Sequence, residues 1–490
     1  MRFFNQRLLG LLAFSLIIGC QQLPPPSGSP FGIDVVDGLG AKADALPPEL
    51  SRGQAVPAGS FVANQLLVQL SENADVSRIV EGFAKLGEVR FNQRFVAIQA
   101  PEGMSLAEAH QILASRPGVA GIELNRIHRA SEARPDPTDS HFDAQWSHRQ
   151  TEARALWLSD TPAVDASKVL VAILDTGLDV DHPEFQDDLG QSRVFAPQNF
   201  ITNENPSADL PVEKDVKDLS AHGTHVAGII GARGNNGQGV AGVSWNVGLM
   251  PVKVLGANGG SDFQILQGLA YALGQDVDGA GSRQSYLATE GVDDRRVGVI
   301  SMSLGYPYHG RHPAYDAAFA TARTMGVVVV VAAGNEGSEV AAPANSAHAI
   351  AVSSTSHYRI GNQIWEWLSG FSNRGARIDL AAPGGQIIST FPSYATFGYD
   401  NQPQPVGYAT ISGTSMACPY VSGTAALLVA KHRPPDGATA SQLAAYHDAV
   451  KQHLQATADD LGAPGKDPLY GWGRINVRKA LTTNFPASYP

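Results

Sequence analysis

Four polar residues, each set among glycine or other small residues, could together catalyse acyl transfer. They are Asp175 in DTGLDVDHPEF, His222 in SAHGTHVAG, Asn335 in AAGNEG and Ser415 in ISGTSMACPY. A serine hydroxyl becomes a good nucleophile only beside a base, and histidine has the pKa suited to that task. A buried carboxylate then holds the imidazole in one tautomer. Backbone N–H groups at a helix start, together with a side-chain amide, would stabilise the oxyanion.

Each of these residues also has an ordinary structural explanation. Ser415 could cap the helix expected after it, Asp175 could cap a turn, and Asn335 lies in good turn sequence. His222 alone could be a surface histidine, and His225 three residues later raises the possibility of a shared metal. HExxH is absent and no third soft ligand follows, so the sequence favours a structural His225 over a catalytic metal.

The elements around these residues indicate an α/β fold. From about residue 134, continuous Val, Ile and Ala runs end at glycine-rich loops and are followed by helix-like segments, as in VLVAILDTG, VGVISMSLG and GVVVVVAAGN. Continuous apolar runs are typical of strands covered on both faces. We therefore expect a doubly wound, mostly parallel sheet. Ligands bind such sheets at the carboxyl ends of the strands, where Asp175 and Asn335 fall.

In the order Asp-His-Asn-Ser, the motifs resemble the subtilisin family of serine proteases (subtilases), in particular its thermitase-like members. The stretches DTGLDVDHPEF, HGTHVAG, SMSLG, AAGNEG and GTSMACP carry the resemblance, which covers residues 134–480. It implies a catalytic triad of Asp175, His222 and Ser415, with Asn335 in the oxyanion hole. The expected activity is that of a serine endopeptidase acting on proteins or peptides through an acyl-enzyme, without an organic cofactor.

The resemblance also implies a substrate groove. One wall would offer backbone partners to an extended peptide from Ser303, Leu304 and Gly305. The segment GANGGSD (256–262) resembles the opposite edge. The small residues Ala332, Ala333 and Gly334 would leave room for a sizeable apolar side chain, which implies a broad endopeptidase with an apolar preference. Simple strand packing is the alternative explanation for Leu304.

Calcium is the metal that the resemblance implies. The residues that match a tight calcium site in thermitase-like relatives are Asp136, Glu184 and Asn236 through their side chains, and Arg233, Gln238 and Val240 through their carbonyl groups. A flexible cage of oxygen ligands suits calcium. Ordinary turn usage of asparagine and glycine in RGNNGQG is the alternative explanation.

The segment before the α/β region has a different pattern. Residues 61–130 read as strand, helix, two strands, helix and strand, with the first helix predicted over 73–87. Ser105 and Glu108 form a capping-box pattern at the start of the second helix. The β-α-β-β-α-β order indicates a small ferredoxin-like α+β domain. It carries no convincing catalytic set, and the resemblance implies a propeptide that inhibits the enzyme and assists its folding.

The N-terminus has the pattern of an export signal. Residues 1–20 combine a positive start with an apolar run of signal-peptide length. The final IIGC resembles the lipobox of bacterial lipoproteins, in which Cys20 would be lipidated; an ordinary secretory signal is the alternative. Residues 21–60, rich in proline and glycine, are expected to be a linker. The enzyme would stay at the cell envelope, or be secreted after cleavage between about Arg129 and Arg134.

The composition fits an exported globular protein. The chain has 490 residues, of which 43% are hydrophobic and 17% are charged, and its formal net charge of −11 argues against nucleic-acid binding. Its two cysteines, Cys20 and Cys418, lie in such different contexts that no disulfide is expected. We expect Cys418 to be buried and inert, and the polar insertion 274–296 to be a surface loop. The catalytic domain, 134–486, is expected to be monomeric and to contact a membrane only through a lipid anchor.

Two other functions deserve comparison with an endopeptidase. A catalytically silent peptide-binding protein on the same scaffold would lack a member of the triad, and none is missing. A peptide ligase, or a processing protease with narrow targets, is compatible with the same residues.

Overall fold

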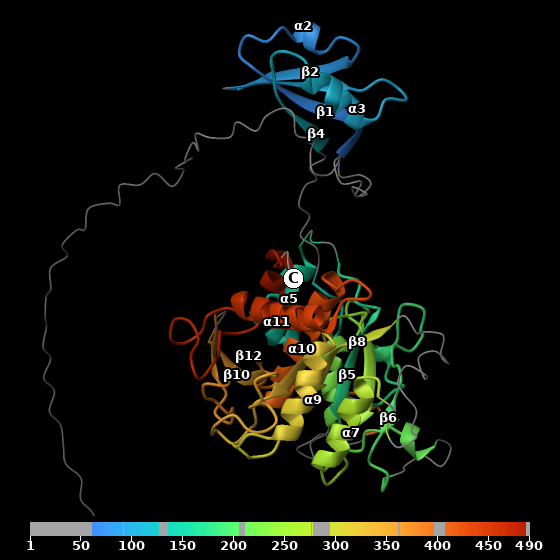
Figure 1. Ribbon diagram of the computed structural model, residues 1–490, viewed down its shortest axis with the longest axis vertical. Coiled ribbons are helices and arrows are strands. Elements are labelled where there is room, and N and C mark those ends of the chain that lie inside the picture. The colour runs from blue at the N-terminus through green and yellow to red at the C-terminus, as the bar shows by residue number, and fades with distance from the viewer. Residues whose placement is uncertain are drawn as a thin grey trace, which may run out of the picture. The chain divides into compact units, whose positions relative to one another are not determined.

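The computed structural model contains two compact units, Met1–Glu132 and Ala133–Pro490 (Figure 1). The residues that it describes are 61–91, 93–126, 136–159, 161, 163–204, 211–275, 277, 295–360, 363–395 and 407–486. The predicted signal, lipidation site, linker and cleavage region lie outside these ranges, as does most of the insertion 274–296.

The first unit is a four-stranded antiparallel sheet with two helices. Its elements are β1 (Phe61–Leu70), α2 (Val76–Ile79), β2 (Ala84–Arg90), β3 (Arg94–Gln99), α3 (Leu106–Ala114) and β4 (Val119–Arg126). The strand order is β2-β3-β1-β4. Leu66 and Val68, two residues apart on one face of β1, pack with Ile79 of α2 and Leu113 of α3.

Local sequence predicted one helix start of this unit correctly and one helix length wrongly. The capping box of Ser105 and Glu108 is present at the start of α3. The helix predicted over 73–87 is wrong, because only Val76–Ile79 is helical. Gly82 has a φ of 84°, a left-handed conformation that ends helices, and the chain then pairs with β3 as β2. Sheet pairing therefore overrides the local helix preference.

The second unit is built on an eight-stranded, mostly parallel sheet. Its strands are β5 (Val169–Asp175), β6 (Gln198–Asn199), β7 (Gly248–Lys253), β8 (Arg296–Met302), β9 (Val328–Ala332), β10 (Ile350–Ile360), β11 (Gln363–Leu368) and β12 (Leu380–Pro383). They lie in the order β11-β10-β9-β8-β5-β7-β6, with β12 beside β10. Of the strand pairs described in this sheet, only β10–β11 is antiparallel.

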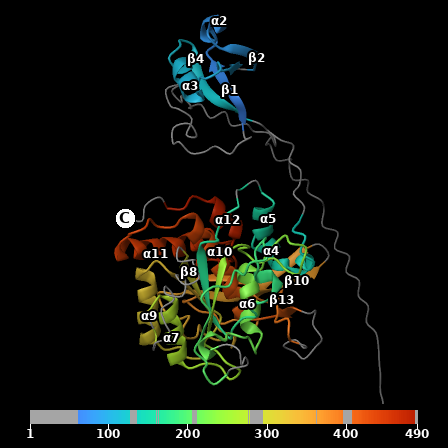
Figure 2. The ribbon, with the colours of Figure 1, turned by 90° about the vertical axis from the view of Figure 1, so that its right-hand side faces the viewer.

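The strand β5 is buried on both faces, which explains its continuous apolar sequence. Val171 and Ile173 pack in a core with α6 (His222–Gly231) and α10 (Thr414–Lys431). Ala172 and Leu174 pack in a second core with α7 (Asp262–Ala272) and α9 (Pro313–Thr324). Figure 2 shows α6 on one side of the sheet and α7 and α9 on the other. The predicted α/β sheet with helices on both faces is confirmed.

Further helices and strands complete the second unit. They are α4 (Trp146–Gln150), α5 (Ala153–Trp157), α11 (Ala440–Ala456), α12 (Val477–Thr482) and the antiparallel pair β13 (Ile387–Thr390) and β14 (Tyr408–Ile411). Across the residues that are described, no helix is both long and apolar enough to cross a membrane.

The order of the strands predicts a crevice at the carboxyl end of β5. β7 pairs with β5 on one side, after the chain has passed through β6 at the sheet edge, and β8 pairs with β5 on the other side. In open α/β sheets, this switch in direction opens a crevice outside the strand ends. Asp175 is the last residue of β5, and Ser303 directly follows β8.

Candidate active site

Asp175 and His222 form a hydrogen-bonded pair at this crevice. The Nδ1 atom of His222, the first residue of α6, lies 2.7 Å from Oδ1 of Asp175. The Asp175 side chain is only 1% exposed, and the same oxygen accepts a hydrogen bond from the backbone N–H of Thr176. Because Nδ1 faces a carboxylate, the neutral ring carries its proton there and leaves Nε2 with a free lone pair. That is the tautomer that a general base needs.

The charges around His222 favour its protonated form. Burial lowers the pKa of His222, but the negative charge of Asp175, their hydrogen bond and the negative charge of Asp218 act in the opposite direction. The pKa of His222 is raised as a result. The carboxylates thus outweigh desolvation, and the imidazole is more basic than that of an ordinary histidine.

Ser415 lies in the first turn of α10, which begins at Thr414. Its Oγ donates to the carbonyl oxygen of Ser303 at 3.3 Å, and Ser303 Oγ donates to the carbonyl oxygen of Ser415 at 2.8 Å. These bonds tie the start of α10 to the end of β8. Ser415 and His222 are both described, and they form no hydrogen bond with each other. Catalytic hydrogen bonds are often long without substrate and tighten in the complex.

The amide of Asn335 and the backbone nitrogen of Ser415 lie close to the same glycine, Gly413. The Oδ1 atom of Asn335 accepts from the Thr414 N–H at 2.8 Å and from its hydroxyl at 2.9 Å, which leaves Nδ2 on the other side of the amide. A methyl group placed on Gly413 would lie 3.8 Å from Nδ2 of Asn335 and 3.6 Å from the Ser415 nitrogen. Two donors beside a serine hydroxyl are the groups that an oxyanion would require.

Asn373, which the sequence analysis did not single out, holds the loop of Asn335. It is fully buried; its Oδ1 accepts from the N–H groups of Glu336 and Ser338, and its Nδ2 donates to the carbonyl of Ala333. Gly334 has a φ of 106°, and a Cβ there would come within 2.3 Å of the Asn373 amide. The sequence around Asn373, SGFSNRG, reads as ordinary turn sequence and gives no signal of this role.

Two of the residues expected to line the substrate groove, Leu304 and Ala333, are buried in a hydrophobic core. Leu304 is 8% exposed and packs in the core with Ile265 and Tyr315, as strand packing alone would require. Ala333 is fully buried in the same core. The backbone after β8 extends to Tyr306, whose N–H donates to the carbonyl of Ala342. What these residues offer an extended peptide is therefore mainly backbone.

Glu184, expected to bind calcium, is a fully buried carboxylate. Its Oε1 accepts from the Val240 N–H and the Tyr408 hydroxyl, and its Oε2 accepts from the Asn236 amide at 2.9 Å. Burial raises the pKa of Glu184 to about 7 against these hydrogen bonds, and the charge of Asp139 acts in the same direction as burial. A second negative charge is thus close to a carboxyl group that is already desolvated.

The surroundings of Glu184 fit a bound cation in part. Asp139 is 4% exposed, and its buried Oδ1 has no hydrogen-bond partner in the part of the chain that the structure describes. A divalent cation would compensate two such carboxylates. Asp136, however, forms an ion pair with Arg154 at 2.5 Å. Within the described ranges, no three or more His, Cys, Asp or Glu side chains gather as a metal site.

Two further polar residues near the site are structural. His225 is fully buried, and its Nε2 lies 3.1 Å from the carbonyl oxygens of Ile387 and Ala409; burial lowers the pKa of His225 to about 3. Cys418 is fully buried as expected, and burial raises the pKa of its thiol to about 11. A thiol of that pKa is a poor nucleophile near neutral pH.

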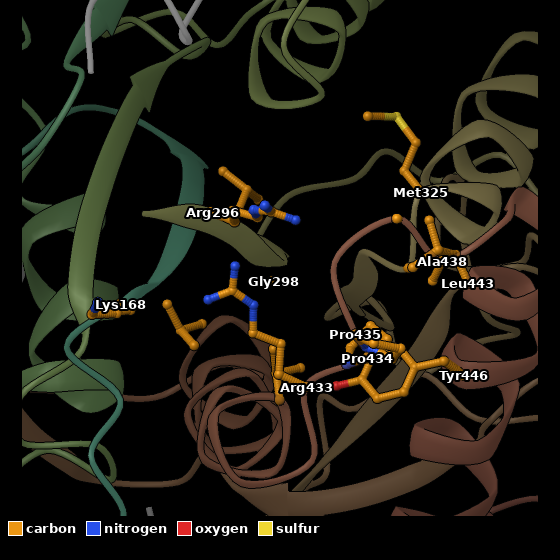
Figure 3. Close-up of a pocket in the computed structure, with 15 residues that line it drawn as sticks. Lys168, Arg296, Gly298, Met325, Arg433, Pro434, Pro435, Ala438, Leu443 and Tyr446 are labelled. Carbon is orange, nitrogen blue, oxygen red and sulfur yellow. The ribbon is translucent and has the colours of Figure 1, made fainter. Parts of the chain in front are cut away.

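A separate pocket lies at the opposite ends of the strands. Its volume is about 130 Å³, and it is lined by Lys168 before β5, Arg296 at the start of β8, and Arg433 after α10 (Figure 3). Arg296 forms an ion pair with Asp436 at 3.0 Å. Because these residues lie at the amino ends of β5 and β8, the pocket is distinct from the crevice of Asp175 and Ser415.

Comparisons with known proteins find similarity to serine proteases. The chain is 27% identical to a thermophilic serine proteinase of Bacillus sp. (strain AK1), over 96% of this chain and all of that protein. It is 30% identical to an alkaline protease of Alkalihalobacillus alcalophilus, over 84% of this chain and 90% of the relative. An extracellular protease of Xanthomonas campestris is 32% identical, over 68% of this chain and 56% of the relative.

A solved protease structure and a family model of subtilases also match this chain. A protease from Pseudoalteromonas arctica superposes with a TM-score of 0.55 at 29% identity, covering 71% of this chain and 99% of that one. The model of the subtilase family matches residues 166–473, a range that includes Asp175, His222, Asn335 and Ser415. The chain belongs to the subtilase family of serine proteases.

Proposed function

We propose that the chain is an exported serine endopeptidase in which Asp175, His222 and Ser415 carry out acyl transfer and Asn335 stabilises the oxyanion. The Asp175–His222 hydrogen bond of 2.7 Å supports this most strongly, together with the bonds that tie Ser415 to Ser303 at the end of the neighbouring strand β8. It orients a basic imidazole whose free nitrogen can take the proton of a serine hydroxyl.

The reaction uses each residue at a named atom. Nε2 of His222 accepts the proton of Ser415 Oγ as that oxygen attacks the carbonyl carbon of the scissile peptide bond. The Ser415 N–H and Nδ2 of Asn335 bind the carbonyl oxygen as it becomes negative. The imidazolium returns its proton to the leaving amine, an acyl-enzyme remains, and water deprotonated by His222 hydrolyses it.

An extended peptide is the substrate that the groove favours. The backbone of Ser303, Leu304 and Gly305 would pair with the peptide as an added strand, with residues 256–262 at the other edge. Backbone pairing is indifferent to side chains, so specificity would be broad. The apolar residues behind this backbone favour apolar side chains of the substrate.

The chain is proposed to be made as a self-processing zymogen. Residues 61–126 form a compact unit outside the region matched by the family model. The Bacillus proteinase aligns with 96% of this chain, so its similarity includes most of the N-terminal part. We assign residues 61–130 as an inhibitory propeptide with a ferredoxin-like fold, preceded by an export signal at 1–20 and a linker at 21–60. Cys20 is the proposed lipidation site, and the catalytic domain is proposed to be a monomer.

Calcium is proposed to stabilise the catalytic domain. Glu184 and Asn236 would be side-chain ligands, together with Asp136 once its carboxylate leaves Arg154. The carbonyl groups of Arg233, Gln238 and Val240 would complete the cage. The ion would supply positive charge next to Glu184 and Asp139. It would take no part in the chemical step.

Hydrolysis of an unfolded protein substrate by the purified full-length chain tests the proposed function. We expect the wild type to release peptides and to cut itself between its two units, and Ser415→Ala to remain uncut. Turnover should fall about a millionfold in Ser415→Ala, the loss that removing the nucleophile costs in subtilisin. Equal hydrolysis by the two proteins would contradict the assignment.

A further inference from the structure

Asp218 is a buried carboxylate beside the Asp175–His222 pair that neither the triad nor the groove accounts for. It is 1% exposed and lies four residues before His222. We propose that Asp218 is a positioning residue, which fastens the loop after β5 to the first turn of α6 and so fixes His222 against Asp175. The inference rests on the proposed function, because it assigns a role in that same reaction.

The two carboxylate oxygens of Asp218 bind the two segments separately. Oδ1 accepts from the hydroxyl of Thr176 at 2.8 Å and from the N–H of Ser220 at 3.1 Å. Oδ2 accepts from the N–H of Thr224 at 2.8 Å and from its hydroxyl at 2.7 Å. Four neutral donors thus surround one buried charge, and hydrogen bonds to charged groups are the strong ones.

The partners of the Asp218 carboxylate lie within two residues of Asp175 or His222. Thr176 follows Asp175 directly, and its hydroxyl oxygen also accepts from the N–H of Gly223, which follows His222. A second connection, through Thr176 and Asp218, therefore runs beside the Asp175–His222 hydrogen bond. Loss of either side chain would let α6 shift against the end of β5.

The backbone between Asp218 and His222 needs this support. Ala221 has a φ of 63°, a left-handed conformation that is unfavourable for residues with a Cβ. The Asp218 bonds to Ser220 and Thr224 span this residue on both sides. Strained backbone at a functional site persists only where its surroundings hold it.

Asp218 is itself held in place through its backbone. Its N–H donates to the hydroxyl oxygen of Tyr394 at 3.0 Å, and that hydroxyl donates to the carbonyl of Asp218 at 2.9 Å. Lys253, 1% exposed at the end of β7, donates to the carbonyls of Thr176 and Lys217 at 3.0 Å each. The loops before α6 and after β5 are therefore fastened at several points around the carboxylate.

The charged and titratable groups that face His222 come from β5, from the loop before α6 and from α6 itself. Asp175 comes from β5, Asp218 from the loop, and His225 from the next turn of α6; burial keeps His225 neutral. The ammonium of Lys253 lies beyond Thr176, bound to its carbonyl. Of the described cations, none forms an ion pair with Asp218. The charge of Asp218 is therefore not compensated by an ion pair with a described cation, and it favours the protonated form of His222.

Four variants of the full-length chain, one of them the conservative Thr176→Ser, separate charge from position. Asp218→Asn removes the negative charge of the carboxylate and disturbs its hydrogen bonds. Thr176→Val removes the hydrogen bonds of the Thr176 hydroxyl with Asp218 and with the N–H of Gly223, but it keeps the charge of Asp218. Asp179→Asn is the control. Asp179, in the loop after β5, is also a buried carboxylate, 4% exposed, but its Oδ2 accepts hydrogen bonds from the N–H and hydroxyl of Ser393.

The readout is kcat and KM over a range of pH, with the active enzyme counted by a fluorophosphonate probe. We expect Asp218→Asn to lower kcat about tenfold or more with little change in KM, and to move the acid limb of kcat/KM about half a pH unit lower. Thr176→Val should lower kcat without moving the limb, and Thr176→Ser should restore it. Asp179→Asn should keep the limb of the wild type.

Failure of the proposed function and failure of the positioning role of Asp218 give different results. If the wild type neither reacts with the probe nor hydrolyses peptides, the proposed function itself fails. If the wild type is active but Thr176→Val keeps full kcat, or Asp218→Asn keeps both kcat and the acid limb, the positioning role of Asp218 is overturned. If Asp218→Asn does not fold, the Thr176→Val and Thr176→Ser pair decides, because both retain the carboxylate.

Discussion

Asp175 directs one oxygen at His222, and the other has no hydrogen-bond partner among the described residues. Oδ1 lies 2.7 Å from Nδ1 of His222, and the buried Oδ2 is the unpartnered oxygen. The orientation of the imidazole thus depends on a single charge-assisted hydrogen bond, supplemented by the network of Asp218.

The first prediction concerns this bond. Asp175→Asn keeps the shape of the side chain but can present an amide N–H to Nδ1 of His222, which favours the tautomer protonated at Nε2. We expect kcat to fall about ten-thousandfold, which corresponds to about 5.5 kcal/mol of barrier, with KM little changed. Steady-state kinetics measure both quantities, and a loss smaller than tenfold would show that Asp175 does not set the tautomer.

The second prediction concerns pH. His222 must be neutral to accept a proton, and its pKa is raised by Asp175 and Asp218 in spite of burial. Activity should therefore be complete above this raised pKa and be lost as the pH falls through it, at a higher pH than for an ordinary histidine. A profile of kcat/KM against pH gives the position of the limb. Unchanged activity at mildly acid pH would contradict the role of His222 as the base.

The third prediction concerns the oxyanion. Asn335→Ala removes Nδ2 and leaves the Ser415 N–H as the remaining donor. We expect kcat to fall by about 10²–10³ with KM nearly unchanged, since the amide acts on charge that develops in the transition state. Fluorophosphonate titration of the variant gives the fraction of folded sites, so that a folding defect is not mistaken for a catalytic one. A change in KM alone would place Asn335 in substrate binding instead.

The fourth prediction concerns calcium. Binding to the folded state alone raises stability in proportion to the logarithm of the ion concentration. We expect added calcium to raise the melting temperature of the wild type and a chelator to lower it, with a much smaller response in Glu184→Gln. Thermal melts of both proteins with calcium and with chelator provide the comparison. An equal rise in both proteins would place the ion elsewhere.

The sequence allowed the sheet and the strand-end residues to be predicted for a simple reason. Strands buried on both faces need continuous apolar residues, so VLVAIL before Asp175 and VVVVVA before Asn335 mark parallel strands whose ends meet at one edge. Cys418 was also predicted correctly, because it lies in an apolar helical stretch.

What the sequence did not indicate depends on tertiary contacts. Asp218 and Asn373 hold loops through hydrogen bonds to distant residues, and no local pattern marks them. The pairing of Asp136 with Arg154, 18 residues along the chain, was missed for the same reason. The helix predicted over 73–87 was wrong because pairing of β2 with β3 decided the conformation there.

The most direct measurement is mass spectrometry of the protein after reaction with a fluorophosphonate, followed by digestion and mapping of the adduct. An activated serine is phosphonylated at Oγ, whereas an ordinary helix-capping serine is not. The expected result is one phosphonyl group on Ser415 in the wild type and none there in His222→Ala. An unmodified Ser415 in folded, processed wild-type protein, or an adduct on another residue, would contradict catalysis by this serine.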